Sequence, residues 1–149
     1  MWKYDIRSTI LKVRENENCK VLSWIIKIKE KQMKNSMIKR TKKFALDNWF
    51  FCSRVPKSRE YNAYVNQLTW SSSSVGANYR SSQRAKSTAD FINKLKIVEE
   101  EVDESVYWLE IFEEILPNES IIIEKLKKEG NELLAITVAS INTARKNQR

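Results

Sequence analysis

The sequence predicts an all-α protein, an up-down-up-down antiparallel four-helix bundle that follows an N-terminal extension. Apolar residues recur in steps of three and four along several long segments, which is the spacing of one helix face. Only two glycines and two prolines occur among 149 residues, and a many-turned β fold needs more turn residues than that. We therefore expect one bundle domain over residues 33–149, after an extension over residues 1–32.

The first bundle helix is predicted over about residues 35–55, because the ring of Pro56 disfavours a helical residue before it. Its second half is apolar on several sides and contains Phe44, Trp49, Phe50 and Phe51. A helix of this kind is buried all round, and in a small bundle a neighbouring subunit is the simplest cover. The sequence therefore predicts a homo-oligomer.

The second helix is predicted over about residues 59–79 and carries a run of four serines, residues 71–74, in its middle. Its apolar steps continue through that run: Tyr61, Val65, Leu68, Ser72, Val75 and Tyr79. Serine hydroxyls inside a helix bond to their own backbone and let helices approach closely. A hydroxyl-based catalytic site is the alternative, and the sequence offers no histidine to activate it.

The third and fourth helices are predicted over about residues 87–116 and 120–146. The third has the seam Phe91, Leu95, Val98, Val102, Ser105, Leu109 and Phe112. Ser87 is its expected N-cap, with Asp90 as the acidic partner of a capping box. Gly130 lies inside the fourth helix at a cost of about 1 kcal/mol relative to alanine. We expect a close helix contact at Gly130, with a functional cleft as the alternative.

Several residue types that support chemistry are scarce. Histidine is absent, and Cys19 and Cys52 are too few for a disulfide framework or a four-ligand zinc site. We expect both to be reduced thiols in a cytoplasmic protein. Residues 21–28 are apolar but far shorter than the roughly 20 residues of a membrane span, so no membrane association is expected. The carboxylates of residues 99–114 lack the histidines of di-iron bundles, so we expect neither a metal nor another cofactor, with an all-carboxylate magnesium or manganese site as the alternative.

The net charge of +8 is distributed unevenly. Lysine and arginine dominate before residue 98, whereas residues 99–120 contain nine acidic residues and no basic one. Such polarity favours a polyanion, an acidic protein partner, or head-to-tail self-association. An up-down bundle brings the early part of the first helix and the second inter-helix connection to the same end.

A basic bundle end is the candidate nucleic-acid site. It would bind phosphate oxygens without reading bases, and added salt would weaken it. The alternative is that these cations are solvated or pair with acidic residues. The candidate residues are Lys39, Arg40, Lys42, Lys43, Arg80, Arg84 and Lys86.

Three segments, residues 73–80, 84–95 and 99–110, together resemble the signature of small bacterial proteins whose genes lie in intervening sequences of 23S ribosomal RNA genes, once labelled S23 ribosomal proteins. The resemblance covers about residues 33–146 and implies a four-helix bundle of no settled activity. It places family-motif residues at Asn78, Tyr79, Arg80, Glu99 and Glu100. Ser81 stands where relatives often have glutamate, and a polar helix corner is the alternative role for Asn78.

Distant relatives of this bundle are accessory proteins of retroelements that act as ring-shaped oligomers with a reverse transcriptase and nucleic acid. By that analogy the expected partners are RNA or DNA, a reverse transcriptase or another nucleic-acid-handling protein, and further copies in a pentameric ring. The chain is then a non-catalytic, nucleic-acid-binding oligomer. A structural or protein-interaction module without nucleic-acid affinity is the alternative, and a metal-dependent hydrolase ranks last. The extension is a lineage-specific appendage or the product of a misplaced start codon, and we expect it to be poorly ordered.

Overall fold

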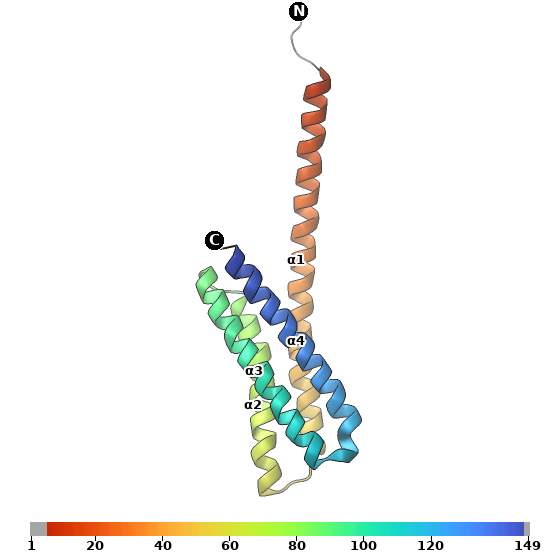
Figure 1. Ribbon diagram of the computed structural model, residues 1–149, viewed down its shortest axis with the longest axis vertical. Helices are drawn as coiled ribbons and strands as arrows, with labels where there is room; N and C mark the ends of the chain where they lie inside the picture. The colour runs from red at the N-terminus through yellow and green to blue at the C-terminus, as the bar shows by residue number, and fades with distance from the viewer. Residues whose placement is uncertain (1–5, 148–149) are drawn as a thin grey trace, which may run out of the picture. The chain divides into compact units, whose positions relative to one another are not determined.

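The computed structural model describes the backbone of residues 6–147 and the side chains of residues 19–147. Four α-helices fill almost all of this range: α1 (Ile6–Arg54), α2 (Arg59–Ser82), α3 (Thr88–Ile115) and α4 (Ser120–Lys146) (Figure 1). A short 3₁₀ turn, η1 (Pro117–Glu119), joins α3 to α4. No strand occurs among residues 6–147, so the predicted all-α four-helix fold is confirmed.

The chain divides into two compact units, Met1–Met37 and Ile38–Arg149. The second unit is the bundle and contains α2, α3, α4 and the part of α1 from Ile38 onward. Helix α1 begins at Ile6, much earlier than the predicted start near residue 35. Neither glycine nor proline occurs before Pro56, so the sequence has no strong breaker that would start a new helix near residue 33. Residues 6–32 are therefore helical and continue without a break into the bundle part of α1.

The start of α3 follows its predicted capping signal, and α2 begins with a serine cap of the same kind. The Ser58 hydroxyl accepts a hydrogen bond from the Tyr61 N–H at 3.2 Å and begins α2. The Ser87 hydroxyl accepts one from the Asp90 N–H at 3.1 Å, while the Asp90 carboxylate accepts one from the Lys86 N–H at 2.9 Å. These bonds satisfy amides that the first turn of α3 leaves free.

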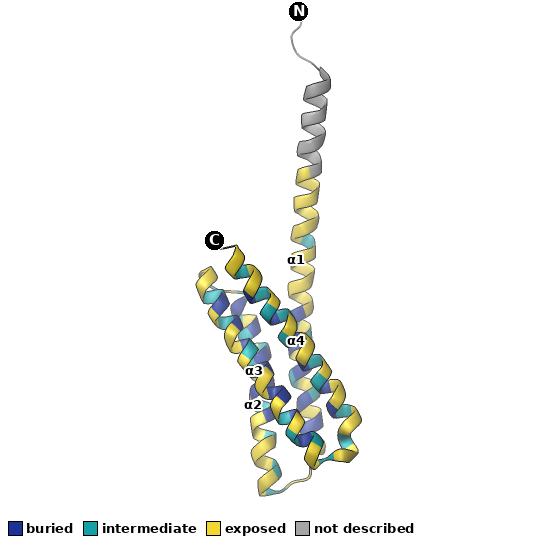
Figure 2. Ribbon diagram, in the orientation of Figure 1, coloured by how far each residue is buried: buried dark blue, intermediate teal, exposed yellow. Residues whose placement is uncertain are grey.

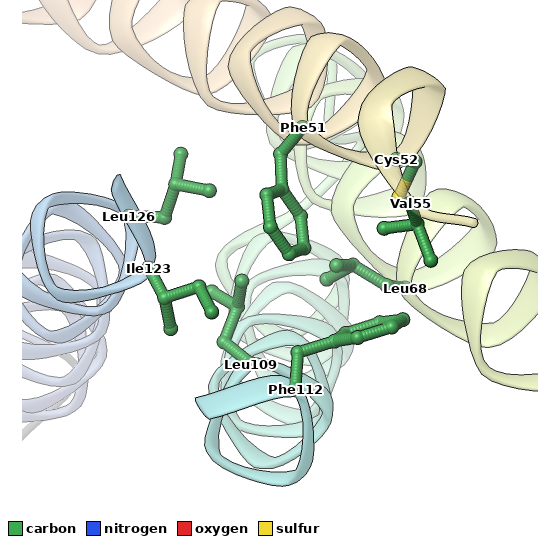
Figure 3. Close-up of a cluster of buried hydrophobic side chains, with 8 residues drawn as sticks. All are labelled: Phe51, Cys52, Val55, Leu68, Leu109, Phe112, Ile123 and Leu126. Carbon is green, nitrogen blue, oxygen red and sulfur yellow. The ribbon is translucent and has the colours of Figure 1, made fainter. Parts of the chain in front are cut away.

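The predicted seams face the interior (Figure 2). Figure 3 shows one layer of the core, in which Phe51 of α1 meets Phe112 of α3 edge to face with ring centroids 5.3 Å apart. On α3 six of the seven predicted seam residues are buried, and Ile92 is buried in place of its half-exposed neighbour Phe91. The layer comprises Phe51, Cys52, Val55, Leu68, Leu109, Phe112, Ile123 and Leu126.

The serine run packs as predicted. Ser71 and Ser72 are buried, and their hydroxyls donate to the Gln67 and Thr69 carbonyl oxygens of the same helix at 3.0 and 3.4 Å. The Ser71 hydroxyl also lies 3.0 Å from the buried Ser105 hydroxyl of α3. These hydroxyls satisfy one another and their own backbone, which supports the packing interpretation over a catalytic one.

The close contact predicted at Gly130 is confirmed. A Cβ atom added there would lie 2.8 Å from Cγ2 of Val106 on α3 and 3.5 Å from the Phe44 ring on α1. Because only hydrogen fits in that space, the glycine lets α4 approach both neighbouring helices.

The predicted all-round burial of the first bundle helix does not occur within one chain. Phe44 and Phe51 are buried, whereas Leu46, Trp49 and Phe50 are 46%, 54% and 58% exposed. Lys39, Lys42 and Lys43 share this outer face by the helical spacing. The bundle therefore leaves an exposed apolar patch beside three lysines on α1. In the described part of the chain, no helix is both long and apolar enough to cross a membrane.

Candidate nucleic-acid interface

The bundle brings the basic residues of α1 and α2 to one end. Gly76 of α2 packs against the backbone of α1, where its added Cβ would lie 3.4 Å from the Thr41 oxygen. The two helices run antiparallel, so Arg80, one turn beyond Gly76, lies on the side of Thr41 where Lys39 is found. Figure 1 shows the connection from α2 to α3 at this same end. We call this surface the basic end.

Five of the seven candidate cations are exposed at or near the basic end: Lys39, Lys42, Arg80, Arg84 and Lys86. None of the five side chains forms an ion pair with any residue of the described range 19–147. Like charges that gather without internal partners repel one another and attract anions from solution. Lys39, Lys42, Arg80 and Arg84 are therefore free to meet phosphate, and Lys86 adds its charge although it also interacts with the Asp90 carboxylate.

Arg40 differs from its neighbours because its half-buried side chain pairs with two carboxylates of α4. Its guanidinium donates to both carboxylate oxygens of Glu129 on α4, each at 2.8 Å, and to Glu132 at 2.7 Å. The bonds to Glu129 raise the pKa of Arg40 above its already high ordinary value. Two carboxylates thus balance the charge of Arg40, and its side chain joins α1 to α4. Lys43 also has a partner, because it pairs with Asp47 one turn along α1.

The C-terminal end of α4 adds two cations that were not among the candidates. Arg145 and Lys146 occupy the last turn of α4 and are exposed. Figure 1 shows this end of α4 at the same end of the bundle as the connection from α2 to α3. The up-down topology predicts this placement, since the end of the fourth helix lies at the end of the bundle where the bundle part of α1, from Ile38 onward, begins.

At the opposite end of the bundle, two cations pair with carboxylates of the same chain. Arg54, at the end of α1, pairs with Glu119 beyond α3 at 3.1 Å. Lys127 donates to Glu113 at 2.6 Å, and this bond raises the pKa of Lys127. Lys57 and Arg59 also lie at this end, in the connection from α1 to α2 and the first turn of α2. Arg54 and Lys127 are thus paired within the chain.

The family-motif residues divide between packing and surface. The Asn78 amide donates to the Ser74 carbonyl oxygen at 3.0 Å, and Tyr79 is buried, which raises the pKa of its phenol. Arg80 and Glu100 are exposed, and Glu99 is half-buried. Helix α2 continues to Ser82, so Asn78 supports its last turns from within and does not end it.

The described residues offer few groups for bond-making chemistry. No group of three or more cysteine, aspartate or glutamate side chains in this part of the chain is arranged to hold a metal ion. The Cys52 thiol is buried in the core, and that burial raises its pKa. Cys19 is exposed.

The family model of 23S rRNA-intervening sequence proteins matches residues 33–139. A crystal structure of a protein of unknown function from the S23 ribosomal protein family of Bacteroides thetaiotaomicron has the same fold, with a TM-score of 0.67. The two sequences are 27% identical, and the match covers 73% of this chain and 97% of that one. No curated protein matches the chain. The matched region begins where the sequence resemblance was expected to begin.

Proposed function

This chain belongs to the family of 23S rRNA-intervening sequence proteins, and from that premise we propose that it is a non-catalytic oligomer that binds structured RNA or DNA through its basic end. The observation that carries the proposal is a set of exposed cations at one end of the bundle that form no ion pair with the described residues 19–147. Three segments supply them: Lys39 and Lys42 on α1, Arg80 and Arg84 around the end of α2, and Lys86 beyond it.

A phosphate backbone is the ligand that this surface fits best. The cations are long, mobile side chains on two helices and a connection, and they can follow a line of phosphate groups. Binding of this kind releases counterions and is insensitive to base identity. The ribosomal RNA in the family name supports RNA as the first ligand to test.

We also propose that the exposed apolar patch on α1 holds copies of the chain together, in a ring. Leu46, Trp49 and Phe50 form a contiguous patch of the kind that marks protein interfaces. An oligomer would carry several basic ends, so weak single contacts would combine into tighter binding of a long nucleic acid. A nucleic-acid-handling protein such as a reverse transcriptase could bind the same assembly.

Charge reversal at one corner tests the nucleic-acid proposal. The variant Arg80→Glu, Arg84→Glu, Lys86→Glu should weaken binding to a structured RNA and a DNA duplex by at least about tenfold, with helicity unchanged. Loss of three phosphate contacts should also reduce the slope of log K against log salt by about 2.7 for duplex DNA. Fluorescence anisotropy across a salt series measures both quantities.

The matched control reverses Lys57 and Arg59, which lie at the other end of the bundle. Each variant inverts a short basic cluster near the start or end of α2, so an effect of net charge alone would appear in both. Equal nucleic-acid affinity of the wild type and the triple variant Arg80→Glu, Arg84→Glu, Lys86→Glu would overturn the proposal. Failure of the wild type to bind either nucleic acid at low salt would do the same and favour the second candidate, a protein-interaction module. The exposed α1 patch is the observation that favours this candidate.

A further inference from the structure

Residues 20–34 of α1 form an amphipathic helix whose apolar face is left exposed by the described residues. Six large apolar side chains in or next to this segment are between 38% and 64% exposed: Val21, Leu22, Trp24, Ile25, Ile26 and Met33. Val21, Ile25 and Ile28 step by four and three along one line of the helix, and Leu22, Ile26 and Met33 follow the adjacent line. A continuous exposed apolar face of this size indicates a docking surface.

The other face of this helix is basic. Lys20, Lys27, Lys31 and Lys34 step by seven, four and three, so they lie in one row opposite the apolar lines. Lys29 adds a fifth cation within the apolar face, and Glu30 is the only acidic residue of the segment. Two such helices would repel each other, so charge argues against pairing of this helix with its own copy. Its occupant must be acidic as well as apolar.

The bundle has a groove of that chemistry between α3 and α4. One hollow is lined by Lys96, Glu99, Glu100, Asp103, Leu134, Val138 and Arg145. A second is lined by Tyr107, Glu110, Ile111, Glu113, Glu114 and Lys127. The α3 residues 96, 100, 103, 107, 110 and 114 step by four and three, so both hollows lie along the same side of α3. We call this surface the acidic groove.

The acidic groove complements the helix in three respects. Six carboxylates and three cations line its two hollows, so its net charge is opposite in sign to that of the lysine row. Leu134, Val138 and Ile111 give it an apolar floor that is only half-buried in the bundle. Residues 20–34 extend about 22 Å as a helix, and residues 96–114 of α3 extend about 28 Å, so the groove is long enough.

We propose that residues 20–34 of one copy lie in the acidic groove of a second copy. The apolar lines then cover Leu134, Val138 and Ile111, while the lysine row reaches the carboxylates at the groove edge. The contact joins two different surfaces, so it is head-to-tail, and it uses a segment that lies almost wholly before the matched family region. It does not depend on nucleic-acid binding.

Zero-length cross-linking of lysine to carboxylate detects this contact directly. Natural-abundance and ¹⁵N-labelled full-length chains are unfolded, refolded together and treated with a carbodiimide, and mass spectrometry identifies the joined peptides. We expect light-heavy products that join lysines of residues 20–34 to carboxylates of residues 99–114. If such products form only within one copy, or do not form, the proposal is wrong.

Exchanging charges between the helix and the groove tests whether the cross-links depend on this particular contact. Lys27→Glu, Lys31→Glu should lower the yield of products from the unchanged Lys20 and Lys34 by about tenfold. Glu100→Lys, Asp103→Lys should lower the yield at the unchanged Glu110 and Glu114 to a similar extent. Combining the four substitutions should restore the yield at Lys20 and Lys34, because the charges attract again. Lys125→Glu, Lys128→Glu, at exposed positions of α4 outside the groove lining, is the matched control.

Circular dichroism of every variant separates loss of contact from loss of fold. A combined variant as defective as its parents, with full helicity, would overturn the proposal. Binding of the wild type to anionic phosphatidylglycerol vesicles, abolished by Lys27→Glu, Lys31→Glu in the absence of light-heavy products, would also overturn it and identify a lipid surface as the occupant.

Discussion

Arg40 of α1 forms a two-pronged ion pair with Glu129 of α4, from Nε to Oε1 and from Nη2 to Oε2, with both distances 2.8 Å. The two residues are 89 positions apart in the chain, and both side chains are about one-third exposed. A guanidinium that meets both oxygens of a carboxylate holds one relative position of the two groups. Arg40 therefore fixes the register of α1 against α4.

Arg40→Ala should lower the free energy of unfolding by about 1 kcal/mol, more than an ordinary exposed ion pair contributes. Lys43→Ala is the matched control, because its exposed pair with Asp47 lies within one helix and should contribute about 0.3–0.5 kcal/mol. Urea unfolding followed by circular dichroism measures both. A double-mutant cycle with Glu129→Ala should show coupling, and strictly additive effects would contradict the role of the pair.

Gly130→Ala should destabilise the bundle although alanine favours helix. The gain in helix propensity is about 1 kcal/mol, whereas overpacking a core costs about 1–3 kcal/mol. The new methyl group would meet Val106, a stiff β-branched side chain, with the fully buried Phe44 ring beside it. The expected net loss is about 1 kcal/mol by urea unfolding.

Gly76→Ala provides the contrast, because its methyl group would lie at 3.4 Å from the Thr41 oxygen, an ordinary contact. This substitution should be neutral or stabilising by up to about 1 kcal/mol. Placing Gly130→Ala in a Val106→Ala background should remove most of its cost. If the loss persisted there, contact with Val106 would not be its cause.

Periodicity predicted most of the fold. The seam of α3 and the close approach at Gly130 follow from apolar spacing and from a glycine where helix continues, because both signals are local. The buried side of α1 was hidden by Asn48, which is completely buried between Phe44 and Phe51 and donates to the Phe44 carbonyl oxygen at 2.8 Å. Because this seam position is polar, the apolar spacing did not single out one buried face, and the apolar residues were predicted to lie on all sides of the helix.

The candidate site was less predictable because pairing across the bundle is not local. Lys39, Arg40 and Lys42 are alike in sequence, and only the position of Glu129 distinguishes Arg40 from the other two. Arg145 and Lys146 could have been assigned to the basic end, since bundle topology places them there. Composition identifies the sign of a surface, and the fold decides which charges remain unpaired.

The stabilising contribution of the Asp90 carboxylate should be lost as the solution becomes acidic. The Lys94 ammonium and the Lys86 N–H bond to its carboxylate and lower the pKa of Asp90 below the ordinary 3.8. A lowered pKa means that the contribution is complete above 3.8 and disappears as pH falls through the folded-state value. The stability difference between wild type and Asp90→Asn should therefore be present near about pH 6 and shrink below 3.8.

Urea midpoints of wild type and Asp90→Asn over that pH range test the prediction. Asp103→Asn serves as the control, because this exposed carboxylate caps no helix. A wild-type to Asp90→Asn difference that stayed constant with pH would show that the cap stabilises α3 through shape alone.

The proposed oligomer should depend on Trp49 and Phe50. Their rings are in edge contact, with centroids 5.2 Å apart, and both stand exposed on α1 next to Leu46. Exposed tryptophan at the centre of an interface typically contributes about 2 kcal/mol or more to association, which is more than tenfold in affinity. Trp49→Ser, Phe50→Ser should therefore shift the protein toward monomer in sedimentation or light-scattering measurements, with helicity retained because neither side chain belongs to the core. Trp70→Ser is the matched control, since Trp70 on α2 is 75% exposed and lies outside the patch. The patch would have no role in assembly if both variants kept the mass of the wild type, or if Trp70→Ser alone produced monomer.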